Sequence, residues 1–341
     1  MMPSQVLLSA ETSEVLRAAA ESSTHSLWLG ALSFEERCVG SLVQLSRENI
    51  KISQGIIVSY QTQVRPTEEA ERRRKANWAV IKAEAGRVFA NPIQELQLPA
   101  YGFPQFQELV EGSVSRSGAD LIIIDITCIT KIHALALAAS LAKTSNAASW
   151  MLGYTAPENY STMAVAPGRT PGWRDIIIAP LSETALLFNE SSSRGILLPG
   201  HEADRLIVAL AEIEPAGGLI AIADSKGRPD LRLVTERRNQ KVISQLMRMR
   251  ASNRSKHVVR ITGLKEMGQL ARHEIQKAKD RSAPVILFPY GPKPLIFVSA
   301  LQLSLSYAEA SWFVYPIPSS YDVAYSEGVH ETSWLIPASV A

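Results

Sequence analysis

The sequence predicts an α/β fold made by tandem duplication of a Rossmann-like unit. We expect two mostly parallel sheets with helices on both faces, a C-terminal hairpin in each lobe, and pseudo-two-fold symmetry between the lobes. Three observations support this fold: an internal repeat, the alternation of strand-length apolar runs with helical periodicity in each copy, and a length of 341 residues, which suffices for two domains with sizeable cores.

The internal repeat is clearest as a constant offset between matching residues. Lys131 and Lys293 lie 162 positions apart, and so do Trp150 and Trp312. Further matches keep the same order with a slowly drifting offset: Pro157 with Pro318, Tyr160 with Tyr321, Gly168 with Gly328, and the segment LGALSFEER at 29–37 with LLPGHEADR at 197–205. A conserved order with nearly constant spacing indicates two diverged copies of one unit.

The elements of the first copy follow from its periodicity. Runs rich in Val, Ile and Leu predict strands, and the segments between them carry helical spacing. The expected strands are 27–32, 55–60, a weak one near 96, 120–124 and 149–154, and the expected helices are 34–46, 66–88, one from about 105, and 132–143. Strands at 161–165 and 175–180 predict a hairpin around Gly168 and Gly172.

The second copy repeats this order. Its expected strands are 195–198, 218–223, 257–261, 284–288 and 311–315, its expected helices are 202–213, 229–246, 264–279 and 295–306, and a hairpin around Gly328 closes it. Short apolar strands that alternate with helices indicate a largely parallel sheet covered on both faces. The connection at about 183–195, which contains the polar run 189–194, marks the junction. We therefore predict a lead-in at 1–24, one lobe at 25–185 and a second lobe at 186–341.

Composition restricts the class of protein. A net charge of +2 does not favour an extended nucleic-acid-binding surface, although it leaves room for a local basic patch. Cys38 and Cys128 lie in apolar contexts outside any metal or redox motif, so we interpret them as small buried side chains in a reducing compartment. The N-terminus lacks signal-peptide features and the apolar runs are only strand-length, so we expect a cytoplasmic protein with no membrane partner.

The sequence contains none of the motifs that would indicate a particular reaction. The chain has no glycine-rich dinucleotide fingerprint after its first strand, no P-loop, no zinc-hydrolase motif and no GxSxG nucleophile elbow. Its six histidines lack metal-ligand spacing. The sequence therefore assigns no cofactor and no metal.

Parallel sheets bind ligands at the carboxyl ends of their strands, which selects a set of candidate residues. The ligand-binding candidates are Glu36, Arg37, Thr127, Lys131, Arg205, Lys293, Tyr160 and Tyr321, and the catalytic candidates are Asp125 and His133. The lysine pair is the strongest signal. A lysine at the start of a helix is unfavourable next to the positive end of the helix dipole, unless an anion binds there.

Four of these candidates also have a purely structural interpretation. Arg37 and Arg205 could pair with Glu36 and Asp204 on a helix surface. Asp125 suits an N-cap or a turn, and His133 suits the interior of a packed helix.

Two Rossmann-like lobes in one chain, built on 27–37 with 197–205, on 125–131 with 287–293 and on the tyrosine-containing segments, resemble the CARF and SAVED sensor proteins of prokaryotic defence systems. This resemblance implies a cyclic or linear oligonucleotide held between the lobes. We therefore expect a ligand-sensing or complex-forming module for a phosphate-bearing, nucleotide-like molecule, with a protein partner or a homodimer as a further expectation. A nucleotide hydrolase or transferase with one working site in the first lobe, or a protein-binding scaffold, are the alternatives.

Overall fold

The computed structural model describes residues 12–61, 66–144, 149–160, 173–183, 192–225, 228–248, 254–319, 326–329 and 332–335. By compactness the chain divides into two units. Unit 1 contains the chain up to His133, Thr144–Ala166 and Tyr321–Ala341, and unit 2 contains Ala134–Lys143 and Pro167–Ser320. Each unit is thus assembled from segments that are discontinuous in the sequence.

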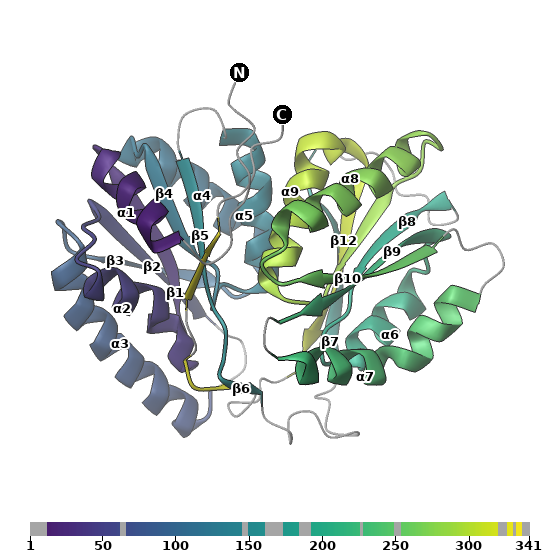
Figure 1. Ribbon diagram of the computed structural model, residues 1–341, viewed down its shortest axis with the longest axis horizontal. Helices are drawn as coiled ribbons and strands as arrows, with labels where there is room; N and C mark the ends of the chain where they lie inside the picture. The colour runs from purple at the N-terminus through teal and green to yellow at the C-terminus, as the bar shows by residue number, and fades with distance from the viewer. Residues whose placement is uncertain are drawn as a thin grey trace. The chain divides into compact units, whose positions relative to one another are not determined.

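Unit 1 is built on a six-stranded sheet with the order β14-β5-β4-β1-β2-β3 (Figure 1). Its strands are β1 (Ser26–Leu32), β2 (Gln54–Gln61), β3 (Gln94–Pro99), β4 (Leu121–Asp125), β5 (Ser149–Thr155) and β14 (Thr332–Leu335). The helices are α1 (Thr12–Ser22), the short 3₁₀ helix η1 (Glu36–Val39), α2 (Gly40–Arg47), α3 (Glu68–Val88), α4 (Phe103–Ser117) and the start of α5 (Lys131–Thr144). Only β14 runs antiparallel to its neighbour in this sheet.

Unit 2 is built on a second six-stranded sheet with the order β10-β9-β8-β11-β12-β7. Its strands are β7 (Trp173–Pro180), β8 (Arg194–Leu198), β9 (Gly217–Asp224), β10 (Arg254–Arg260), β11 (Val285–Pro289) and β12 (Ser311–Pro318). The helices are α6 (Ala203–Glu212), α7 (Pro229–Arg248), α8 (Leu264–Lys279), α9 (Lys293–Ser306) and the short 3₁₀ helix η3 (Ala308–Ala310). Here only β7 is antiparallel to its neighbour.

The two sheets have the same strand order. Counted within each copy, both run third, second, first, fourth, fifth, followed by one antiparallel strand. This order and the helices between the strands confirm the predicted fold class of two mostly parallel Rossmann-like sheets.

The expectation that the closing strand of each copy belongs to its own lobe is wrong. β7 pairs with β12, in the sheet of the second copy, and β14 pairs with β5, in the sheet of the first copy. A further short pair joins β6 (Asn159–Tyr160) to β13 (Ser326–Glu327). The proposed strand at 161–165 lies outside the described residues. Local alternation of apolar residues identifies a strand, but it carries no information about which sheet the strand joins.

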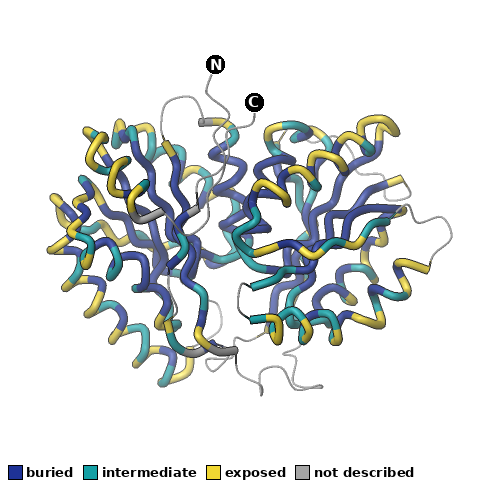
Figure 2. Tube along the Cα trace, viewed as in Figure 1, coloured by how far each residue is buried: buried dark blue, intermediate teal, exposed yellow. Residues whose placement is uncertain are grey.

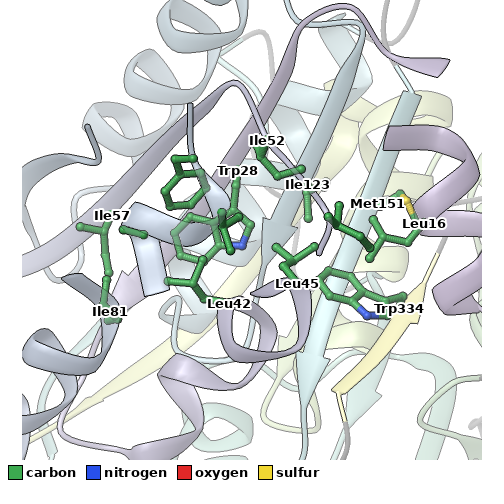
Figure 3. Close-up of a cluster of buried hydrophobic side chains, with 14 of the residues drawn as sticks. Leu16, Trp28, Leu42, Leu45, Ile52, Ile57, Ile81, Ile123, Met151 and Trp334 are labelled. Atoms are coloured by element: carbon green, nitrogen blue, oxygen red, sulfur yellow. The ribbon is translucent and has the colours of Figure 1, made fainter. Parts of the chain in front are cut away.

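The core of unit 1 shows why β14 belongs to its sheet. Figure 3 shows Trp334 of β14 in one buried cluster with Leu45 of α2 and Met151 of β5. Trp334 lies opposite Gly153 in the register, and a Cβ atom on Gly153 would come within 2.9 Å of the indole ring. The glycine therefore leaves the space that the tryptophan fills. Leu16 of α1, from the segment expected to be a lead-in, lies in the same cluster.

Buried residues follow the strands in both units, and exposed residues lie mainly on the helices (Figure 2). No helix among the described residues has the length and apolar character needed to cross a membrane.

Candidate functional site

The carboxyl edge of the sheet in unit 1 is organised around Asp125. This last residue of β4 is 2% exposed. Its carboxylate accepts a hydrogen bond from the Ser41 hydroxyl and another from the backbone N–H of Thr127, at 2.9 Å. The Thr127 hydroxyl in turn accepts from the backbone N–H of Thr155, also at 2.9 Å. Asp125 thus orders the turn after β4, which is the structural role that its sequence allowed.

Arg37 is buried behind this turn. Its Nε and Nη2 donate to one carboxylate oxygen of Glu35, at 2.9 and 2.6 Å, and its Nη1 donates to the carbonyl of Thr155 at 3.4 Å. The expected surface pair with Glu36 is wrong, because η1 begins at Glu36 and leaves that side chain exposed while Arg37 turns back to Glu35. The Ser326 hydroxyl of β13 donates to Glu35 at 2.6 Å. The arginine therefore ties the loop after β1 to the end of β5.

Arg205 plays the corresponding role in unit 2. It lies on α6, is buried, and pairs with Glu202 instead of the expected Asp204, because Glu202 is one helical turn before it. Its Nη1 donates to the Tyr315 hydroxyl at 3.2 Å, and its guanidinium lies 5.6 Å from the centre of the Trp173 ring. Each copy thus buries an arginine that follows the first strand of that copy and donates a hydrogen bond to its fifth strand, β5 or β12.

Sequence reasoning missed a second repeated pair, Asn77 and Asn239. The side-chain amide of Asn77, on α3, donates to the carbonyls of Ser33 and Glu35 at 3.0 and 3.1 Å. The amide of Asn239, on α7, donates to the carbonyl of Gly200 at 2.9 Å. Each asparagine is buried and fixes the loop after the first strand of its copy, β1 or β8. The two are separated by the same 162 positions as Lys131 and Lys293, so the repeat offset was the signal that could have found them.

Lys131 and Lys293 occupy equivalent positions. Lys131 is the first residue of α5 and Lys293 the first residue of α9, and both side chains are half-buried. Each follows the loop after the fourth strand of its sheet, β4 or β11. The structure therefore places both lysines at the start of a helix that follows the carboxyl end of a central strand, as the sequence predicted.

The loop before Lys293 is rigidly held. Tyr290 is buried, its hydroxyl donates to the carbonyl of Val314 at 2.7 Å, and its backbone N–H donates to the carbonyl of Leu198 at 3.1 Å. Burial raises the pKa of the Tyr290 hydroxyl well above its usual value. The tyrosine thus stays neutral and serves as a fixed support for the loop.

His133 is fully buried in an aromatic stack. Its imidazole lies parallel to Phe106 with ring centres 4.4 Å apart, and the Tyr60 ring lies 5.1 Å away on a tilted plane. Burial lowers the pKa of His133 to about 3, against a smaller opposing effect of the Gly102 backbone. A neutral, enclosed imidazole fits the packing role that the sequence left open.

The two cysteines lie side by side behind the same edge. Cys38 is buried in the core of unit 1 and the half-buried Cys128 packs against it. A hydrogen bond with Cys128, and then burial, raise the pKa of the Cys38 thiol well above its usual value. Both are free thiols and pack as apolar side chains, as predicted.

The tyrosine candidates are only partly placed. Tyr160 lies in β6, where its backbone pairs with Ser326, and Tyr321 lies outside the described residues. Among the residues that the structure describes, no group of three or more His, Cys, Asp or Glu side chains is arranged to hold a metal ion.

Comparison with known proteins finds similarity in structure alone. No family model and no curated protein matches the sequence. Among solved structures, a type III CRISPR defence DNA nuclease activated by cyclic oligoadenylate is similar with a TM-score of 0.52 and 11% identity, over 84% of this chain. This chain spans 65% of the length of that nuclease, and the likeness shows a shared fold.

Other solved structures are more distant. The rRNA methyltransferase aviRa from Streptomyces viridochromogenes has a TM-score of 0.22 and 12% identity, over 49% of this chain and 79% of its own. A CobK precorrin-6A reductase has a TM-score of 0.24 and 11% identity, over 88% and 91% of the two chains. These two carry no argument about function.

Proposed function

We propose that this chain is a ligand-sensing module of an antiviral defence system, and that the carboxyl edge of each of its two sheets binds a phosphate-bearing, nucleotide-like ligand. The observation that carries the proposal is the matched pair Lys131 and Lys293. Two sheets of the same strand order each place a half-buried lysine at the first residue of the helix after the fourth strand.

Electrostatics explains why such a lysine suits an anion. The first turn of a helix presents backbone N–H groups and the positive end of the helix dipole. An ammonium group at the same place adds a full positive charge, which is unfavourable for the helix alone and favourable once a phosphate binds. The turn held by Asp125 and the loop held by Tyr290 fix the two helix starts before any ligand arrives.

The class of ligand is suggested by the similar nuclease. Its activator is a cyclic oligoadenylate, and its fold matches most of this chain. We propose the same class here, a small cyclic oligonucleotide, because its phosphates supply the negative charge that a lysine at a helix start favours. This chain spans only part of that nuclease, so the proposal concerns ligand binding and leaves the nuclease activity with that protein.

Charge reversal at Lys131 tests the proposal. The wild-type chain is melted with and without mono-, di- and cyclic oligonucleotides at low and moderate salt. A ligand at a hundredfold excess over its Kd is expected to stabilise the wild-type fold by about 3 kcal/mol, which raises the melting temperature by several degrees. In Lys131→Glu this stabilisation is expected to disappear, because a carboxylate then repels the phosphate.

Lys143→Glu is the matched control. Lys143 is exposed in the last turn of the same helix, so its reversal changes the net charge equally at the other end. The control is expected to keep the ligand-induced shift. If no oligonucleotide stabilises the wild-type chain, the sensing function is wrong. An equal shift in Lys131→Glu and the wild type would remove this lysine from the site.

The alternative of a nucleotide hydrolase or transferase has weaker support. The first copy carries the acidic residue Asp125 where the second has Leu287, and the second copy's loop 288–293 contains no acidic residue, an asymmetry that a single working site would produce. Asp125, however, is buried, and its carboxylate accepts hydrogen bonds from Ser41 and Thr127. Burial also keeps His133 neutral. Mass spectrometry of the ligands recovered from the melting samples would show turnover if that alternative held.

A further inference from the structure

One face of α7 carries a strip of positive charge at the surface of unit 2. Positions three, four or seven residues apart share a face of a helix. On α7 the residues Leu233, Arg237, Gln240, Lys241, Ser244, Gln245 and Arg248 follow this spacing, and all except the half-buried Ser244 are exposed. Figure 2 shows the exposed residues along this helix.

The strip lines two shallow hollows. One, of about 450 Å³, is lined by Lys241, Ser244, Gln245 and Arg248. The other, of about 260 Å³, is lined by Leu233, Glu236, Arg237, Gln240 and Lys256, the last from the edge strand β10. We call these hollows together the α7 groove.

The α7 groove has a strong excess of positive charge. In the described part of its lining the one carboxylate is Glu236, and it already pairs with Lys256 at 3.0 Å. Arg237, Lys241 and Arg248 make no ion pair with any described residue. Three uncompensated cations therefore follow one another along the helix, although the whole chain carries a net charge of only +2.

The first copy shows that folding does not require two of these three cations. The buried asparagines Asn77 and Asn239 make the same kind of contact and align α3 with α7. In this alignment Lys241, Gln245 and Arg248 correspond to Ala79, Ala83 and Gly86 of the first copy, whereas Arg237 corresponds to another cation, Lys75. The same strand order therefore forms without charge at the positions of Lys241 and Arg248. Arg248 also complements the helix dipole in the last turn, but Arg237 and Lys241 in the middle of the helix have no such role.

We propose that the α7 groove binds the phosphate backbone of a nucleic-acid duplex. From Arg237 to Arg248 the helix rises about 17 Å at about 1.5 Å per residue, which matches about five steps of one strand of a duplex. Gln240, Ser244 and Gln245 between the cations supply neutral hydrogen-bonding groups of the kind that contact phosphate and sugar oxygens.

The lining of the α7 groove also indicates that unpaired bases are not recognised there. The described lining contains no aromatic side chain on which an unpaired base could stack. We therefore propose contact with the backbone of a duplex, independent of base sequence. This surface is separate from the residues of the proposed sensing site, so either proposal can fail alone.

Fluorescence anisotropy with a labelled duplex of about 25 base pairs tests this inference. Lys241→Gln/Arg248→Gln is compared with the wild type at several salt concentrations. Loss of two phosphate contacts is expected to weaken binding at least about tenfold near 0.1 M salt, and to make the slope of log K against log salt shallower by about 2.

The matched control is Lys75→Gln/Lys82→Gln on α3, which removes two exposed lysines from the corresponding helix of the first copy. This control is expected to bind the duplex within twofold of the wild type. The inference is overturned if the wild type does not bind at low salt, or if both double variants weaken binding equally. Displacement of the duplex by poly-glutamate at an equal concentration of charge would overturn it too, in favour of an acidic protein partner.

Discussion

Glu274→Leu is expected to lower the free energy of unfolding of unit 2 by about 3–5 kcal/mol, because it leaves a buried arginine without its carboxylate. Arg194, at the start of β8, and Glu274, on α8, are each 2% exposed at the side chain. Arg194 donates to one carboxylate oxygen of Glu274 from Nη2 at 2.5 Å and from Nε at 2.9 Å. Thermal or denaturant unfolding measures the loss.

The double variant Arg194→Met/Glu274→Leu separates the two causes of that loss. If the cost comes from an unpaired buried charge, the double variant recovers most of the lost stability, because two apolar side chains of similar size need no partner. If the double variant is as unstable as Glu274→Leu, poor packing explains the loss instead. Glu69→Leu, which removes an exposed carboxylate that pairs with Arg72 and Arg73, is expected to leave the unfolding midpoint almost unchanged.

The stability of unit 1 is expected to fall as the pH drops from about 6.5, because of His133. Its pKa is about 3 in the folded chain, and an unfolded histidine has a pKa near 6.5. Between these values the unfolded state binds one more proton than the folded state, so acid favours unfolding by about 1.4 kcal/mol per pH unit. At pH 5.0 the expected loss relative to pH 7.5 is about 2 kcal/mol.

His133→Phe tests this pH dependence, since a phenyl ring can fill the same stack with Phe106 and Tyr60. Urea unfolding between pH 7.5 and 5.0 is expected to show about 2 kcal/mol less pH dependence in the variant. Carboxylates titrate alike in the two proteins, so their contribution cancels in the comparison, and burial raises the pKa of Tyr60 still further above this window. Equal pH dependence in both proteins would mean that the folded imidazole titrates normally.

The repeated part of the fold could be predicted from the sequence because it depends on local patterns. The offset between Lys131 and Lys293, together with strand-length apolar runs such as 121–124, implied two copies of one strand–helix series. The last strand of each copy could not be assigned to its sheet. Trp334 pairs β14 with β5 by filling the space above Gly153, and this contact joins residues far apart in the chain.

The candidate site was predictable in position and less so in its contacts. The predicted end of the fourth strand placed Asp125 and Lys131 at the carboxyl edge of the sheet, because the carboxyl ends of parallel strands lie at the same edge. The partner of Arg37 was not predictable, since Glu35 and Glu36 both lie within two residues of it in the sequence. The start of η1 at Glu36 decides between them by sending that side chain outward. Likewise, no local pattern shows that α4 and β2 enclose His133 between Phe106 and Tyr60.

Amide hydrogen exchange with a bound cyclic oligoadenylate tests the central claim most directly. The claim is that the anion binds where α5 and α9 begin, after β4 and β11. At saturating ligand, exchange is expected to slow in peptides covering Thr127–His133 and Tyr290–Ile296, and to stay unchanged in Gln94–Pro99 of the edge strand β3. Unchanged exchange at both helix starts, with the ligand shown to be bound, would contradict the proposed site.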